Sequence, residues 1–295
     1  MARLRLIPVL LICGALASAA PGDLVGAPQE PQAAPTLEAP KQSPEAYEPE
    51  EGQDGKDVVW VPTSEAVVER MLDLANVGPA DYVIDLGSGD GRTVIAAARR
   101  GARARGVEFN PEMVALSKRR AAAAGVSPER ASFVQGDLFE TDLSRATVIT
   151  MFLLPSINMK LRPHLLELAP GTRVVSNSFS MEDWEPDDRS TVGREDGCEN
   201  WCTALLWIVP AKVSGTWRVG SEELRLEQQF QMLTGTLGSQ PIDDGRVRGK
   251  EIRFKVAERQ YTGRVNGRTI DGAPTRTGEH GWTATRVETG RTASP

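Results

Sequence analysis

A glycine-rich loop is the part of the sequence best suited to hold a small ligand. Gly87, Gly89 and Gly91 alternate with other residues, directly after the apolar run at residues 82–86. Glycines at these positions let the backbone turn sharply and approach a ligand closely, beside the N-terminus of the next helix. The pattern predicts a nucleotide-like cofactor at the end of a buried strand.

The residues around the loop distinguish between cofactors. A dinucleotide-binding fingerprint has a third glycine where this chain has Arg92, whose bulk would obstruct close packing of helix and strand. Asp85 and Asp90 flank the loop, and carboxylates favour a cofactor with a sulfonium and an ammonium group over a pyrophosphate. The loop residues predicted to bind this cofactor are Asp85, Gly87, Ser88, Gly89 and Asp90.

Two further carboxylates follow predicted strands. Glu108 lies about 20 residues beyond the loop, where a carboxylate can accept hydrogen bonds from both hydroxyls of a ribose. Asp137 could accept a hydrogen bond from an adenine amino group, with Phe109 and Leu138 covering the ring. The alternatives are an ordinary strand-end acid at the first position and a turn aspartate at the second.

A parallel sheet would bring these residues together. Between residues 58 and 210, short β-branched runs alternate with helix-length segments, which is typical of βαβ units in a doubly wound α/β fold. We predict strands at 82–86, 104–108, 132–135, 146–150 and 172–176. We predict a first helix that opens at 62–65, with Thr63 or Ser64 as its cap, and extends to 75, and further helices at 91–100 and 111–124. Because ligands bind at the carboxyl ends of such strands, the loop, Glu108 and Asp137 should share one crevice.

As a set, these residues resemble the class I, or seven-β-strand, S-adenosylmethionine-dependent methyltransferases. Residues 83–91 are similar to the first motif of that family, residues 106–108 to its second motif, and residues 136–137 to its adenine-side motif. The resemblance covers residues 58–210 and implies S-adenosylmethionine as cofactor and a Rossmann-like, mostly parallel seven-stranded sheet. It also implies a seventh strand antiparallel to the sixth. Methyl transfer depends mainly on alignment of donor and acceptor, and the sequence identifies no catalytic residue.

A narrower resemblance concerns the methyl acceptor. Residues 61–64 and 151–155 look similar to a small lysine methyltransferase group that includes the mitochondrial ATP synthase c-subunit methyltransferase. It implies that Thr63 and Ser64 approach the cofactor and that the segment after the fourth strand lines the acceptor site. It favours a protein lysine or a small amine as acceptor, which stays unidentified. The polar candidates near the acceptor are Ser156, Asn158 and Asn177.

Trp184 lies among acidic residues after the fifth predicted strand. An aromatic and acidic surface there would attract a cationic acceptor, and burial of the indole against the domain is the alternative. His164, after Pro163, is interpreted as a residue at a helix start and not as a general base.

The N-terminus predicts export. Basic residues precede an apolar run at residues 6–20, and small residues at 17–19 suit a signal peptidase, so residues 1–19 are predicted to be a signal peptide. An uncleaved membrane anchor is the alternative. A membrane span needs about 20 residues, and this apolar run is at the short limit of that range. Residues 20–57 contain seven prolines and nine acidic residues and are predicted to form a disordered linker. We expect a periplasmic or secreted protein without a stable membrane span.

Two cysteines remain after signal removal. Cys198 and Cys202 predict a disulfide in an exported protein. No metal site is expected, because only His164 and His280 could add ligands and both are distant in sequence.

The C-terminal part has a different pattern. From residue 213 to 290 apolar and polar residues alternate, and the Asp-Gly or Asn-Gly pairs at 244–245, 266–267 and 271–272 indicate hairpin turns. This pattern predicts a small antiparallel β barrel or sandwich that covers the first domain or recruits a partner.

Charge and composition narrow the function. A net charge of −6 provides no general attraction to phosphate backbones, so we expect no nucleic acid partner. The leading hypothesis is N-methylation of a protein lysine or other amine. The alternatives are a non-catalytic S-adenosylmethionine-binding envelope protein and an aminopropyl transferase on the same fold.

Overall fold

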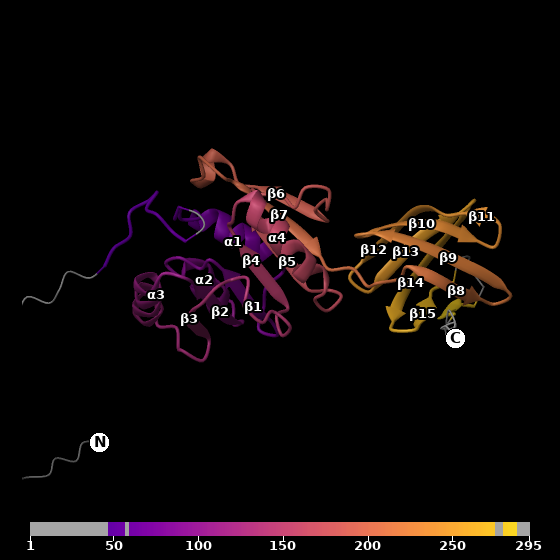
Figure 1. Ribbon diagram of the computed structural model, residues 1–295, viewed down its shortest axis with the longest axis horizontal. Helices are drawn as coiled ribbons and strands as arrows, with labels where there is room; N and C mark the ends of the chain where they lie inside the picture. Colours follow the sequence, from indigo (N-terminus) through magenta and orange to yellow (C-terminus); the bar gives the residue numbers. More distant parts are fainter. Residues whose placement is uncertain (1–46, 57–58, 275–279, 288–295) are drawn as a thin grey trace, which may run out of the picture. The chain divides into compact units, whose positions relative to one another are not determined.

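The computed structural model describes residues 47–56, 59–274 and 280–287. These residues form two β-sheets, of which the first carries the four described α-helices (Figure 1). We call the first sheet with its helices the α/β domain and the second sheet the barrel. The predicted signal peptide at residues 1–19 lies outside the described residues, as do residues 20–46 of the predicted linker.

The sheet of the α/β domain has the strand order β3-β2-β1-β4-β5-β7-β6. Strands β1 to β5 run parallel, and β7 pairs antiparallel with both β5 and β6. This topology confirms the predicted seven-stranded, mostly parallel sheet and the antiparallel pairing of the sixth and seventh strands. The strands are β1 Tyr82–Leu86, β2 Arg103–Glu108, β3 Ala131–Gln135, β4 Val148–Met151, β5 Arg173–Asn177, β6 Asp188–Thr191 and β7 Thr203–Ile208.

Local signals in the sequence explain where three of the helices lie. Ser64 caps α1, Glu65–Leu74, by accepting a hydrogen bond from the Val67 N–H, and Asn110 caps α3, Pro111–Ala123, in the same way. Helix α2, Arg92–Arg99, follows Gly91 at the end of the glycine loop. Ser64, and not Thr63, is therefore the cap of α1. The Thr63 side chain is not used at the helix end, and Thr63 lines the pocket described below.

Helix α4, Pro155–Leu166, corrects one prediction. His164 lies exposed in its last turn and not at a helix start, and Pro163 lies inside the helix. A proline removes one helical hydrogen bond, but Ile157, Leu161 and Leu165 recur every four residues and bury one face of the helix. Burial of that face sustains the helix through the proline.

The helices cover both faces of the sheet because neighbouring strand residues point in opposite directions. Val83 and Val148 belong to the apolar core that includes α1, α2 and α3, whereas Ile84 and Ile149 belong to the core that includes α4. The sheet is therefore doubly wound, as predicted. No helix in the described part of the chain is long and apolar enough to span a membrane.

The second sheet is a closed antiparallel barrel of eight strands. The ring runs β9-β10-β12-β13-β14-β15-β16-β8 and closes by pairing of β8 with β9, while β11 extends from β10. Closure settles the choice between barrel and sandwich. The strands are β8 Gly215–Val219, β9 Glu222–Gln229, β10 Met232–Leu237, β11 Gln240–Pro241, β12 Asp243–Arg248, β13 Glu251–Val256, β14 Arg259–Asn266, β15 Thr269–Gly272 and β16 Thr283–Arg286.

Of the three predicted hairpin turns, only the one at 266–267 joins two strands. Residues 244–245 lie inside β12, where the register with β13 shifts, and residues 271–272 end β15. A Cβ on Gly245 would lie 2.5 Å from the Leu233 carbonyl oxygen, so this glycine allows β10 and β12 to approach closely. Glycine at position 245 therefore allows two strands to pack closely and does not form a hairpin turn.

Candidate cofactor and acceptor site

One pocket lies at the carboxyl ends of β1, β2, β3 and β4, and it brings together every residue predicted to bind the cofactor. Its empty space, which includes open solvent, is about 1070 Å³. The ten predicted cofactor-binding residues in this pocket are Thr63, Asp85, Gly87, Ser88, Gly89, Asp90, Glu108, Phe109, Asp137 and Leu138. The individual role of each residue in binding stays a prediction.

The glycines of the loop are required by both backbone and space. Gly89 has a φ of +52°, and a Cβ there would lie 2.6 Å from Nε1 of Trp60. Gly106, on the neighbouring strand β2, has no room for a side chain, since its Cβ would lie 2.4 Å from the Ser88 Oγ. The loop can therefore approach both the strand and a ligand only with these glycines in place.

Arg92 and Asp90 form an ion pair at the start of α2. The Arg92 guanidinium donates to the Asp90 carboxylate and, at 2.7 Å, to the Thr63 carbonyl oxygen. Arg120 forms a second ion pair with Asp90. Burial raises the pKa of Asp90, but the two guanidinium groups hold it below its ordinary value. Asp90 thus lines the pocket with its charge compensated, which differs from the predicted role as an anion that attracts the cofactor.

Asp85 is the pocket carboxylate whose ionised form a cationic ligand would stabilise. It is buried, and its Oδ1 accepts a hydrogen bond of 2.6 Å from the Thr150 hydroxyl. Burial raises the pKa of Asp85 to about 7, against the effect of the Thr150 hydrogen bond, and the nearby charges of Asp90 and Glu108 raise it further. An ammonium group beside this carboxylate would favour its ionised form.

Glu108 and Ser88 also fit S-adenosylmethionine. Both carboxylate oxygens of Glu108 accept backbone hydrogen bonds of 2.9 Å, from the N–H groups of Gly89 and Asn110. Each oxygen keeps a second lone pair, which suits the two hydroxyls of a ribose. The Ser88 hydroxyl is buried without a hydrogen-bond partner in the described part of the chain, and a bound ligand would satisfy it.

The end of the pocket at Asp137, which is predicted to bind adenine, includes a residue that sequence reasoning missed. Asp137 accepts a hydrogen bond of 2.8 Å from the Phe139 N–H and forms an ion pair with Lys56, and these two contacts lower its pKa. The Lys56 ammonium lies 4.9 Å from the centroid of the Phe109 ring. The one signal for Lys56 was its position as one of two bases in the acidic segment at residues 20–57.

Lys56 belongs to the last part of the predicted disordered linker. Residues 47–56 are described, and their backbone pairs with Trp60 through hydrogen bonds of 2.8 and 2.9 Å that involve Gly52 and Gln53. The Tyr47 carbonyl oxygen accepts a hydrogen bond from Arg119. This end of the segment therefore folds against the α/β domain, which differs from the predicted tether, because Trp60 and Lys56 provide contacts that the composition of the segment conceals.

The end of the pocket beyond β4 is apolar. Met151, Phe152, Leu153 and Ile157 line it. Asn177 lies beside it, because its Nδ2 donates to the Thr63 hydroxyl at 3.5 Å. Of the three polar acceptor candidates, Asn177 is thus the one with a side-chain hydrogen bond to a pocket residue in the described part of the chain.

The other candidates have structural roles. Asn158 is buried and donates to the carbonyl oxygens of Phe179 and Ser180, while Ser156 is exposed on α4. Ser64 is the cap of α1 and does not line the pocket. Trp184 is fully buried against Trp207, so the predicted aromatic and acidic surface for a cationic acceptor is wrong and the alternative, burial against the domain, is confirmed.

Known proteins are similar to this chain over the same region. The model of the ANTKMT methyltransferase domain matches residues 85–188. A protein-lysine N-methyltransferase of Saccharolobus islandicus (strain REY15A) is 46% identical over 155 residues, which cover 52% of this chain and 94% of the relative. The adenine nucleotide translocase lysine N-methyltransferase of Mus musculus is 40% identical, over 44% of this chain and 56% of the relative. The chain thus spans about half the length of this mammalian relative.

A solved structure is also similar to this chain. A structure of an RNA methyltransferase from Salinibacter ruber, in complex with S-adenosyl-L-homocysteine, is 49% identical and covers 52% of this chain and 96% of that chain, with a TM-score of 0.48. The protein is an S-adenosylmethionine-dependent methyltransferase, and its relatives favour this activity over a non-catalytic binding protein or an aminopropyl transferase. The chain belongs to the family of S-adenosylmethionine-dependent protein-lysine N-methyltransferases.

Proposed function

We propose that the protein methylates the side-chain amine of a lysine in a protein acceptor. The observation that carries this proposal is the apolar end of the pocket, where the residues at and after β4 are Met151, Phe152, Leu153 and Ile157. An apolar surrounding lowers the pKa of a lysine amine by desolvation, and only the neutral amine has a lone pair for attack. The lysine specificity named for the relative from Saccharolobus islandicus supports the same acceptor.

The chain's own residues contribute binding and alignment. Asp85 and Ser88 would hold the methionine end of the cofactor, Glu108 its ribose and Asp137 its adenine. When bound, S-adenosylmethionine supplies a methyl group activated by a positively charged sulfur. In the transfer, the amine nitrogen would bond to the methyl carbon, the carbon–sulfur bond would break with its electron pair on sulfur, and the proton lost by the amine would pass to solvent. Phe152 and Leu153 exclude water from this end and favour the neutral amine.

Transfer of labelled methyl groups tests the acceptor. The full chain is incubated with methyl-labelled S-adenosylmethionine and a protein extract of its native host, and mass spectrometry locates the label. We expect methyl-lysine, with labelling abolished in Glu108→Ala and retained in Glu112→Ala, which removes an exposed acid of α3 outside the pocket. Label that ribonuclease releases, or label confined to small amines, would contradict a protein-lysine acceptor.

We further propose that the protein acts outside the cytoplasm. The signal-peptide pattern of residues 1–19 supports export, and the Cys198–Cys202 disulfide suits an oxidising compartment. N-terminal sequencing of the protein from its native host should find a chain that begins at Ala20. A mature chain that begins at Met1 would contradict cleavage.

A further inference from the structure

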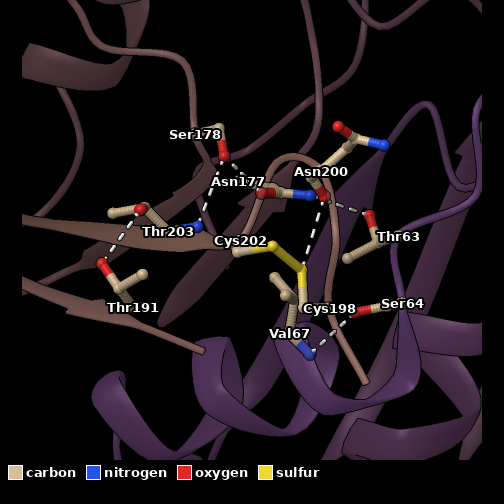
Figure 2. The surroundings of a disulfide bond; sticks show 10 residues. All are labelled: Thr63, Ser64, Val67, Asn177, Ser178, Thr191, Cys198, Asn200, Cys202 and Thr203. Atoms are coloured by element: carbon tan, nitrogen blue, oxygen red, sulfur yellow. Dashed lines mark hydrogen bonds between the residues drawn. A yellow bond between two sulfur atoms is a disulfide. The ribbon is translucent and has the colours of Figure 1, made fainter. Parts of the chain in front are cut away.

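The Cys198–Cys202 disulfide closes a short loop between β6 and β7 (Figure 2). Cys198 is buried in the same apolar core as Val67 of α1, and Cys202 packs against that core. The Cys202 carbonyl oxygen also accepts a backbone hydrogen bond of 2.8 Å from Val192. Figure 2 shows the disulfide near Thr63, which lines the pocket. Both ends of the loop are therefore held in place next to the cofactor site.

This loop presents Trp201 in an unusual way. Its φ is +52°, in the left-handed region that bulky side chains rarely adopt, and 44% of the residue is exposed. Such a conformation persists where its surroundings hold it, and it often marks a functional position.

Trp201 extends an aromatic surface that begins in the pocket. The centroids of the Phe152 and Trp201 rings are 5.9 Å apart, and those of Phe152 and Phe179 are 5.7 Å apart. Phe152 itself lines the cofactor pocket. The Ser176 hydroxyl fixes the turn at Phe179 by donating to its carbonyl oxygen at 2.7 Å. The three rings thus form a continuous wall from the pocket to solvent.

The charges around Trp201 favour a cationic occupant. Glu195 and Asp196 lie exposed just before the disulfide-closed loop and Glu199 lies exposed within it, and Arg194 is the only base between residues 192 and 203. Aromatic ring faces attract ammonium groups, and neighbouring carboxylates strengthen that attraction.

We infer that Phe152, Phe179 and Trp201 form the wall along which the acceptor lysine side chain reaches the cofactor, and that the Cys198–Cys202 disulfide positions Trp201 in it. This inference rests on the proposed function, because it takes the acceptor to be a protein lysine. Trp201 contacts the acceptor, whereas the two cysteines act only through Trp201.

Steady-state kinetics with poly-L-lysine as the probe test this role. The variants are Trp201→Leu, which keeps an apolar side chain, Trp201→Phe, which keeps an aromatic ring, and the double variant C198S/C202S. We expect KM for poly-L-lysine to rise roughly threefold to thirtyfold in Trp201→Leu, and less in Trp201→Phe. The double variant should raise KM as Trp201→Leu does. All should keep kcat and the affinity for S-adenosylhomocysteine, because Trp201 does not line the cofactor pocket.

Two controls separate a role of the aromatic wall from a general loss of apolar surface or of folding. Met232→Ala removes an apolar side chain of similar exposure from β10 of the barrel and should leave KM unchanged. Trp201→Leu keeps the disulfide, so it tests the wall even if C198S/C202S does not fold. An unchanged KM in Trp201→Leu with an active wild type overturns this inference alone, as do equal losses of kcat, cofactor affinity and stability in the Leu and Phe variants. A wild type that binds S-adenosylhomocysteine but methylates no lysine overturns the proposed function itself.

Discussion

Replacing Asp85 with asparagine should stabilise the α/β domain at neutral pH while weakening cofactor binding. Asp85 is buried with its only described hydrogen bond from Thr150, and an asparagine side-chain oxygen can accept the same bond. The substitution therefore removes the charge with little change in shape. The substitution therefore separates the effect of the buried charge on stability from the effect of side-chain packing.

The size of the effect follows from the pKa of Asp85, which burial raises from 3.8 to about 7. Between these pH values the folded chain keeps a proton on Asp85 that the unfolded chain has released, so the free energy of unfolding falls as pH rises. At about 1.4 kcal/mol for each pKa unit, the wild type loses about 4 kcal/mol by the time the pH passes 7. The free energy of unfolding of Asp85→Asn does not fall in this way, because the asparagine side chain does not ionise.

Urea unfolding at a series of pH values measures this pH-dependent loss of stability. The helix signal in circular dichroism reports on the α/β domain, because the four described α-helices all belong to it. The free energy of unfolding of Asp85→Asn minus that of the wild type should increase between about pH 4 and about pH 7 and then stay constant. Since all other carboxylates titrate in both proteins, the difference isolates Asp85.

Calorimetry with S-adenosylhomocysteine, which keeps the ammonium group, measures the opposite effect. The wild type should bind more weakly as pH falls below about 7, by up to about tenfold for each pH unit, because Asp85 must first lose its proton. Asp85→Asn should bind more weakly at pH 8 and show no such dependence. A difference in stability that is the same at pH 5 and pH 8 would refute the raised pKa and with it the assignment of Asp85 as the partner of the cofactor's ammonium.

Further substitutions test the rest of the site and the barrel. Gly106→Ala should lower the free energy of unfolding by about 1–3 kcal/mol and weaken S-adenosylhomocysteine binding, because its Cβ would displace Ser88; unchanged affinity in calorimetry would argue against the loop as the binding element. Asp137→Ala should weaken S-adenosylhomocysteine roughly tenfold, whereas S-inosylhomocysteine, without the adenine amino group, should bind variant and wild type alike; equal losses for both ligands would exclude the amino-group contact. Phe254→Ala should destabilise the barrel by about 3–5 kcal/mol, as judged by thermal unfolding, because it empties the stack with Tyr261. The same variant should keep its cofactor affinity, since no barrel residue lines the described pocket; lost affinity would show that the barrel supports the site.

Much of the α/β domain follows from short stretches of sequence. The apolar run at Tyr82–Leu86 is the strand β1, and Asn110 with Pro111 places the start of α3, because a cap and a fixed proline φ act within one turn of helix. Features that depend on distant neighbours could not be predicted in this way. Pro163 lies inside α4 because the opposite face of that helix is buried, and Gly245 serves the approach of β10 instead of a turn.

The sequence by itself determined the cofactor and the fold that binds it. The loop glycines, Glu108 and Asp137 follow consecutive strands, and a parallel sheet brings the ends of such strands to one edge, so spacing along the chain becomes proximity in space. Only the tertiary structure decided how the pocket is completed. Lys56 reaches Asp137 from the segment that precedes α1, and Trp201, between β6 and β7, reaches Phe152, just after β4. Such contacts depend on how separate elements pack, and no local pattern of residues encodes them.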